Sequence, residues 1–435
     1  MPAEPVASII GELNRRLKSF DIADPDTLPD VLAAIYVALA SFPQGVLQDY
    51  EQFAEHDLRE AAFSRAAQLT AIGLAVNGDQ PLYDGAILLR AVEQIALQFV
   101  RSIESDGDGD LEDAWRTSDG QFYVVPRITR LEAVDGKKFS RRALIGHRVL
   151  PVVADGLQVR LHRSPALADS VTAMQLRAAT PLRYGAAFFP ELEIVISPGE
   201  SEFIVETITG CDGPALIAEQ ILKARKEGCS AIVWAELTMP EQNLAAVRST
   251  LRRQALDDGK SPDFVVAGSW HAMVDGTMRN VSHVLDGGGV DIFRLFKWAK
   301  FKFAGRIEGI EPGGEIPVLV TEGQLAVTAI CRDFLQDDKE PPYCAINADL
   351  ALVPSMAPRE SAAATMSGHA TTANSMRNRF GTRTLVVQQP PAPASGIVGQ
   401  VLAFPDKPLD APIGSDVDQS WRTCPLVPGK SGTIS

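Results

Sequence analysis

The sequence predicts an α/β protein preceded by a mainly helical N-terminal region. From about residue 184 to residue 405, short apolar runs typical of strands alternate with amphipathic segments typical of helices, which indicates sheets covered by helices. Residues 5–104 instead carry apolar side chains at spacings of three and four, the period of a helix. Hydrophobic residues make up 46% of the chain and charged residues 22%, a balance typical of globular proteins that bury a core.

The order of these patterns predicts four regions. Residues 1–120 form a helical N-terminal domain, interrupted where Asn77-Gly78 and Pro81 break the periodicity. Residues 121–184 hold short β-like runs separated by turn residues, which predict a connecting region of short strands. The α/β domain then covers 185–410. Prolines are frequent in the last part of the chain and predict an extended tail over 411–435.

Composition also restricts partners and location. The net charge of −14 argues against a nucleic-acid or anionic-membrane partner, since both require clustered Lys and Arg. The longest apolar stretches are shorter than the roughly 20 residues that cross a bilayer, and the N-terminus shows no signal peptide. Five scattered cysteines without a Cys-x-x-Cys pair favour a reducing compartment. We therefore expect a cytoplasmic protein. Separately, the six histidines show no metal-binding spacing, so no metal site is expected.

Three segments place reactive side chains at the ends of apolar runs. Residues 230–237 read as a buried strand that delivers Glu236 where the strand ends. Residues 296–303 embed three lysines among aromatic side chains, and residues 323–333 read as a second buried strand that ends in Cys331. The ends of buried strands are where open α/β sheets keep their active sites. Each segment alone is also compatible with a structural role, so their combination carries the prediction.

Together and in this order, the segments resemble the nitrilase, or carbon–nitrogen hydrolase, superfamily. Its pattern is a strand ending in a catalytic Glu, a Tyr-Arg-Lys-Ile-His-Leu-like segment, and a strand ending in Ile-Cys-Tyr-Asp. The stretches 263–291, 309–333 and 348–389 resemble its structural segments, so that the resemblance covers about 190–405. It implies a four-layer αββα sandwich, a homo-oligomer, and catalysis without a metal or organic cofactor.

The resemblance also implies roles for individual residues. Cys331 would be the nucleophile, Glu236 the base that takes its proton, and a lysine the positive charge beside the oxyanion. Lys300 aligns best with the family lysine, and Lys302 ranks second because it would share the same strand face. Lys297 ranks third, since an odd separation places it on the opposite face of a strand. Glu308 is the candidate for the second glutamate of the family.

The residues after the nucleophile depart from the family pattern. Arg332 stands where the family has Tyr or Trp; its backbone N–H would be a second oxyanion donor, and its side chain either meets an anionic substrate group or is a surface charge. Asp333 resembles the amidase-like branch more than the nitrilase-like one. Asp333 therefore favours amides over nitriles as substrates, whereas Arg332 departs from both branches.

The leading hypothesis is a thiol hydrolase that cleaves a small amide through a Glu-Lys-Cys triad and a thioester intermediate. Its N-terminal helices would support oligomerisation or bind a protein partner. The alternative is a nitrilase-fold interaction or regulatory protein, with catalysis secondary or absent. The intact trio favours catalysis, and acyl transfer at the same site remains open.

Overall fold

The protein divides into two compact units. The computed structural model describes residues 3–103, 111–126, 138–163, 183–197, 199–258, 262–321, 324–336, 339–392, 396–405 and 413–425. The N-terminal unit is Met1–Val153 with Ala345–Asn347, and the C-terminal unit is Ala154–Cys344 with Ala348–Ser435. Gly323 and the last ten residues of the expected tail lie outside the described residues.

The N-terminal unit is mainly helical, as predicted. Its helices are α1 (Ala3–Leu17), α2 (Leu28–Ala40), α3 (Gln44–Asp49), α4 (Glu55–Ala66), α5 (Leu69–Ile72), α6 (Pro81–Ile103), α7 (Leu111–Trp115) and α8 (Phe139–Arg142). The apolar faces of α2 and α6 form the centre of its core, where Leu32, Ile35, Leu89 and Val92 have no more than 1% exposure. An antiparallel pair, β1 (Phe122–Pro126) and β2 (His147–Pro151), completes the unit.

A buried carboxylate holds the segment before β2 against α6. Glu93 of α6 accepts backbone hydrogen bonds from Ile145 and Gly146 at 3.0 and 2.7 Å and lies 3.4 Å from Nδ1 of His147. Burial raises the pKa of Glu93, but the hydrogen bond and charge of His147, with Arg90 and the Ile145 N–H, outweigh burial and lower it below the usual value. The ionised carboxylate therefore stabilises this unit.

Replacing Glu93 with glutamine is expected to destabilise the N-terminal unit by about 2–4 kcal/mol at pH 7. The pKa of Glu93 is lower in the folded protein, so its contribution is present above the unfolded pKa and is lost as pH falls through the folded one. Hydrogen exchange of peptides from 138–151 measures both effects. Glu12→Gln, at an exposed pair with Arg15, is the matched control and should change nothing. Equal protection in the Glu93 variant and the parent protein would contradict the assignment.

The C-terminal unit contains two large mixed sheets. The first has the order β11-β12-β10-β9-β5-β22, with β13 also pairing with β12; the second has the order β21-β20-β19-β18-β17-β16-β4-β3. The strands of the first are β5 (Arg183–Ala187), β9 (Ala231–Trp234), β10 (Phe264–Val266), β11 (Trp270–Val274), β12 (Thr277–Asp286), β13 (Asp291–Phe296) and β22 (Trp421–Pro425). The strands of the second are β3 (Val153–Ala154), β4 (Leu157–Arg163), β16 (Glu315–Val320), β17 (Leu325–Thr328), β18 (Leu350–Met356), β19 (Arg383–Gln389), β20 (Gly399–Phe404) and β21 (Ile413–Val417).

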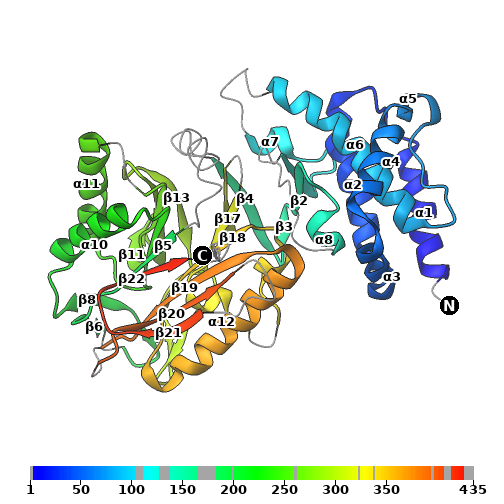
Figure 1. Cartoon of the computed structure of the whole chain (residues 1–435). Helices are drawn as coiled ribbons and strands as arrows, with labels where there is room; N and C mark the ends of the chain where they lie inside the picture. Colours follow the sequence, from blue (N-terminus) through cyan, green and yellow to red (C-terminus); the bar gives the residue numbers. More distant parts are fainter. Residues whose placement is uncertain are drawn as a thin grey trace, which may run out of the picture. The chain divides into compact units, whose positions relative to one another are not determined.

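The sheets pack face to face, and helices cover their outer faces (Figure 1). Val233 and Phe293 of the first sheet share one buried cluster with Leu350 and Leu385 of the second. Helices α10 (Gly213–Glu227) and α11 (Glu241–Asp258) pack on the other face of the first sheet. Helix α12 (Arg359–Phe380) packs on the second sheet, against β19 and β20. The predicted αββα sandwich is therefore confirmed.

Two small sheets add to this sandwich. One pairs β6 (Glu193–Ile196) with β8 (Val205–Thr209), and the other has the order β14-β15-β7, formed by Lys302–Phe303, Arg306–Glu308 and Glu202–Phe203. A short 3-10 helix, η3 (Cys331–Phe334), follows β17. These elements place the residues of the candidate site.

The structure changes two of the predicted regions. The region 121–184 is not a separate connector, because β1 and β2 belong to the N-terminal unit while β4 pairs in parallel with β16 in the second sheet. The expected extended tail is also wrong over 413–425. There β21 pairs with β20 and β22 pairs with β5, so the segment supplies one strand to each sheet.

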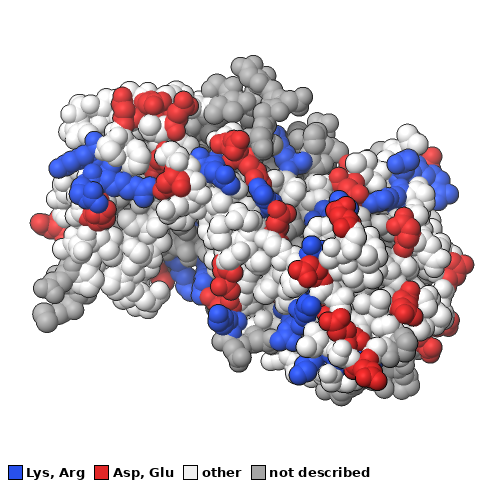
Figure 2. Space-filling view, turned by 180° about the vertical axis from the view of Figure 1, so that it is seen from behind, with Lys and Arg blue, Asp and Glu red and all other residues white. Residues whose placement is uncertain are grey.

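The described residues contain no single helix that combines the length and apolar character needed to cross a membrane; only a bent pair, Pro25–Ala40 with Gln44–Gln52, meets these criteria jointly. On the face of the molecule drawn in Figure 2, basic and acidic side chains are interspersed. An extended basic surface of the kind that binds nucleic acid is not seen on that face.

Candidate active site

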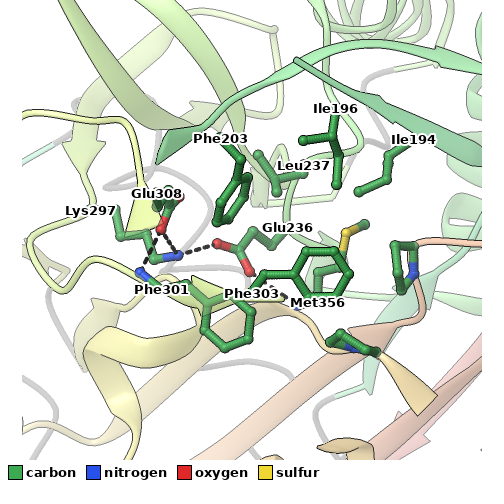
Figure 3. A pocket seen from close by; sticks show the side chains of 12 residues that line it. Ile194, Ile196, Phe203, Glu236, Leu237, Lys297, Phe301, Phe303, Glu308 and Met356 are labelled. Atoms are coloured by element: carbon green, nitrogen blue, oxygen red, sulfur yellow. Dashed lines mark hydrogen bonds and ion pairs between the residues drawn. The ribbon is translucent and has the colours of Figure 1, made fainter. Parts of the chain in front are cut away.

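Two carboxylates and one ammonium group meet in the interior of the C-terminal unit. Glu236 follows β9, Lys297 follows β13, and Glu308 ends β15. The Nζ atom of Lys297 donates to Oε1 of Glu236 and to Oε2 of Glu308, both at 2.7 Å. The three residues are each no more than 2% exposed. Charges buried this deeply require partners, and here the two carboxylates share Lys297 as a common partner (Figure 3).

Asn280 and His271 donate further hydrogen bonds to the two carboxylates. Asn280 of β12 donates to Oε1 of Glu236 at 3.1 Å and to Oε1 of Glu308 at 2.9 Å. Nδ1 of His271 accepts the backbone N–H of Val205 at 2.7 Å, so the ring proton sits on Nε2 and is donated to Glu308 at 3.0 Å. The array fixes Glu236 with one oxygen on the lysine.

The charges of the cluster stabilise one another. Burial lowers the pKa of Lys297, but Glu236 and Glu308 outweigh burial and raise it above its usual value. Burial likewise raises the pKa of Glu308, yet Lys297 and the hydrogen bond from His271 bring it below the ordinary value. The lysine is therefore an ammonium and Glu308 a carboxylate at neutral pH.

Cys331 lies beside this cluster at the start of η3. Its backbone has a φ of 44°, and the residue after Glu236, Leu237, has a φ of 57°. Such left-handed conformations are strained for residues other than glycine and concentrate at functional sites. The backbone of Met356 connects Glu236 with Cys331. Its N–H donates to Oε2 of Glu236 at 3.1 Å, and its carbonyl accepts from Sγ of Cys331 at 3.6 Å.

The Cys331 thiol is neutral at rest. Burial and the charge of Glu236 raise its pKa to about 12, although Lys297 and the hydrogen bond from Ser355 oppose the rise. The thiol is 1% exposed. A neutral thiol is a weak nucleophile, so this cysteine needs a base to remove its proton.

Buried polar residues fix the turn that carries Cys331. Asp333 accepts the backbone N–H groups of Trp298 and Ala299 at 3.1 and 2.8 Å, which ties the segment after Lys297 to η3. His369 of α12 lies 3.1 Å from the carbonyl oxygen of Cys331 through Nε2. Burial lowers the pKa of His369 to about 4, so the ring is neutral at pH 7 and Nε2 is its donor. The lysine and the thiol are thus held in a fixed arrangement.

A small pocket that is partly open to solvent lies beside the cluster. Glu236, Lys297 and Glu308 form its polar end, and the rest of the lining is apolar. In the view of Figure 3, aliphatic side chains and Phe203 lie on one side of Glu236, and Phe301 and Phe303 lie on the other. The apolar lining residues are Ile194, Ile196, Phe203, Leu237, Phe301, Phe303, Met356, Pro358 and Pro391.

The lysine at the cluster is Lys297, which the sequence analysis ranked third. Lys300 was ranked first by alignment, and the alternation of faces that ranked Lys302 above Lys297 does not apply, because strand β13 ends at Phe296. Lys300 is half-buried, and Lys302 is exposed on β14. Of the three candidate lysines, Lys297 is thus the one that the structure brings to Glu236 and Glu308. Glu236 and Glu308 lie together as predicted.

The side chain of Arg332 is half-buried. Neither Arg332 nor Cys331 is among the residues that line the pocket. Sequence reasoning also passed over Asn280, Ser355 and His369, whose polar groups become informative only once the sheets bring them to Glu236 or Cys331.

A signal for Lys297 was present in the sequence. Phe293 and Leu295 face the core between the sheets, and Lys297 continues their two-residue period.

Among the described residues, no group of three or more His, Cys, Asp or Glu side chains is arranged to hold a metal ion.

Known proteins resemble the chain in structure only. No family model matches the sequence, and no curated protein matches it. Solved structures with similarity include an amidase from Nesterenkonia sp. (16% identity, 57% of this chain and 92% of that chain, TM-score 0.40). Others are a carbon–nitrogen hydrolase from Helicobacter pylori G27 (12%, 56% and 88%, 0.39) and a glutamine-dependent NAD+ synthetase from Acinetobacter baumannii (13%, 56% and 45%, 0.41). These identities and TM-scores are low, and the αββα arrangement follows from the strand pairing of this chain itself.

Proposed function

We propose that this protein is a carbon–nitrogen hydrolase of the nitrilase type that cleaves small amides through Cys331. The observation that carries the proposal is the buried Glu236–Lys297–Glu308 array beside a cysteine with a strained backbone. Carboxylate, ammonium and thiol are the groups that thiol-based amide cleavage requires. A structural role alone gives no reason to bury this combination beside a pocket.

In the first step, Glu236 takes the proton of the Cys331 thiol as the sulfur attacks the amide carbon. Glu236 suits this role because Lys297 and the Met356 N–H fix its two oxygens. Lys297 supplies a positive charge for the oxyanion that develops, with the backbone N–H of Arg332 as the proposed second donor. Glu236 then gives its proton to the leaving amine, which produces ammonia or an amine and a thioester on Cys331.

In the second step, Glu236 removes a proton from water, and the resulting hydroxide attacks the thioester carbonyl. The acid product leaves as the sulfur takes the proton back from Glu236. Glu308 stays ionised throughout, because Lys297 and His271 bind it on both oxygens. Its role is to hold the lysine in place, and the reaction needs no cofactor.

The pocket supports amides of uncharged, apolar acyl groups as the substrate class. Apart from the three polar residues at its end, no other charged side chain among the described residues lines it. A carboxylate or ammonium on the substrate would lose its hydration there without gaining a partner. Branched aliphatic and aromatic acyl groups match the walls formed by Ile194, Ile196, Phe301 and Phe303.

Turnover of isobutyramide and benzamide is expected to exceed that of succinamate by about 100-fold or more in kcat/KM, because succinamate brings an unpaired charge into the pocket. Ammonia release measures the rates. Mass spectrometry of the quenched reaction should find the acyl group on the peptide that contains Cys331. An acyl group on another residue, or no turnover of any amide, would refute the proposal and favour the interaction-protein alternative.

A pair of neighbouring variants controls this test. Ile196 lines the pocket, whereas Val195 is 41% exposed. Ile196→Lys should therefore depress isobutyramide turnover by about tenfold or more and narrow the difference from succinamate. Val195→Lys adds the same charge to the same strand and should leave both rates unchanged.

A further inference from the structure

A row of polar side chains runs from Cys331 across the second sheet, and the mechanism above does not use it. It consists of Ser355 on β18, Gln388 on β19, Gln400 on β20 and Asp416 on β21, which are direct cross-strand partners in the sheet register. We name these four residues the polar row. Ser355 is fully buried and Gln388 is 2% exposed.

The hydrogen bonds of the polar row have one direction. The carboxylate of Asp416 accepts from Nε2 of Gln400 at 3.0 Å, so the carbonyl of Gln400 faces Gln388. Nε2 of Gln388 donates to Oε1 of Gln400 at 3.0 Å and to the backbone carbonyl of Ala362 at 3.3 Å. The carbonyl oxygen of Gln388 is therefore turned towards Ser355, and it can only accept.

Ser355 then has one hydroxyl proton and two acceptors. Its Oγ lies 3.3 Å from Sγ of Cys331 and 3.4 Å from Oε1 of Gln388. A hydroxyl donates one hydrogen bond at a time, so these two contacts compete. When Cys331 is a thiol, its own proton points to the Met356 carbonyl and the hydroxyl is available to Gln388. When Cys331 is a thiolate, the charged sulfur is the stronger acceptor.

Other charged or titratable groups also lie near Cys331, but they act on it by means other than the hydrogen bond that Ser355 makes to its sulfur. Glu236, after β9, repels the thiolate, and Lys297, after β13, attracts it. Glu308, on β15, pairs with Lys297. On η3, Asp333 accepts two backbone N–H groups, and His369 of α12 contacts the carbonyl oxygen of Cys331 rather than its sulfur.

We propose that Ser355 is a positioning residue whose hydroxyl turns from Gln388 to the Cys331 sulfur when the thiol ionises, and that Gln388 sets how readily it turns. The hydroxyl keeps its own proton throughout; the thiol proton goes to Glu236. This inference rests on the proposed function, in which Cys331 is the nucleophile. It makes the ionisation of Cys331 depend on a residue that never contacts the substrate.

The rate of Cys331 alkylation by iodoacetamide, followed against pH by peptide mass mapping, tests this proposal. Ser355→Ala removes the donor and should raise the midpoint pH of alkylation by about one unit. Gln388→Leu removes the competing acceptor and should lower the midpoint by a smaller amount. Ser355→Thr keeps the hydroxyl and should restore the parent midpoint. Thr384→Val, a buried substitution elsewhere on β19, is the control and should not shift it.

Opposite shifts in Ser355→Ala and Gln388→Leu support the proposal, because structural damage would move both in the same direction. A midpoint unchanged in Ser355→Ala, or moved in the same direction by both variants, overturns it. If Gln388→Leu does not fold, the comparison of Ser355→Ala with Ser355→Thr decides alone. Alkylation needs no substrate, so amide turnover that persists without these shifts refutes this inference and leaves the proposed function standing.

Discussion

Lys297→Met is expected to lower kcat/KM for small amides by about 100- to 1,000-fold, whereas Lys300→Met should leave it within about twofold. Lys297 is 1% exposed and donates to both Glu236 and Glu308, so methionine removes the positive charge that we assign to the oxyanion. Lys300 is half-buried, in the irregular segment after β13. The two variants differ by three positions and make the same chemical change, which makes Lys300→Met a close control. Steady-state ammonia release with isobutyramide measures both.

Removing Lys297 also carries a cost in stability. Two buried carboxylates then face each other through Asn280 without a counter-charge, which is expected to destabilise the C-terminal unit by about 3–5 kcal/mol. The double variant Lys297→Met with Glu308→Gln removes one carboxylate and should recover part of that stability without recovering turnover. Full activity in a folded Lys297 variant, or equal losses in the Lys297 and Lys300 variants, would contradict the assignment.

Cys331→Ala is expected to abolish amide turnover, with a fall in kcat of at least about 10⁴-fold. Alanine cannot form the thioester, and Cys331 is the cysteine whose thiol feels the charges of Glu236 and Lys297. Cys344→Ala is the matched control, since Cys344 is equally buried at 1% exposure and its thiol also has a pKa raised by burial to about 12. Circular dichroism and thermal unfolding establish that both variants fold.

The Cys331→Ala variant distinguishes a catalytic role of Cys331 from a purely structural one. Cys331→Ala removes a small buried group and leaves the backbone of η3 in place, so a stability loss of only about 1–2 kcal/mol is expected. Turnover that survives in a folded Cys331→Ala protein would remove the thiol mechanism altogether. Loss of turnover in the Cys344 variant alone would place the reacting thiol elsewhere.

The sheet strands and two members of the site were predictable because their signals are local. Glu236 and Cys331 each follow an apolar run whose burial is nearly complete, and such runs identify buried strands from composition alone. Glu308 was placed by resemblance, and the structure brings it to Lys297. The alternation of strand and helix likewise predicted the helices α10 and α11.

Lys297 was ranked third because Lys300 aligned better with the family lysine and because the end of β13 cannot be recognised from the residues of the segment. Aromatic residues continue through Trp298 and Phe301, so the run resembles a strand well past Phe296. The true end is set by tertiary contacts, since Asp333 binds the N–H groups of 298 and 299 that a continuing strand would have used. Those contacts come from a segment more than thirty residues later, which no local pattern contains.

The predicted tail failed for a related reason. The prolines in the last part of the chain indicate an extended segment, and the strands β21 and β22 are indeed extended. Whether an extended segment pairs depends on an available sheet edge, and β20 and β5 provide one each. Edge availability is a property of the assembled sandwich.

The two late strands have a consequence for how the protein is made. During synthesis from the N-terminus, β5 and β20 emerge before β22 and β21, so the edges of β5 and β20 that bind these strands stay unpaired until residues 413–425 leave the ribosome. Open edges recruit other strands, and the nascent chain is therefore most prone to aggregate in this interval. Segments only a few residues apart then add β22 to one sheet and β21 to the other, where they become the new edge strands.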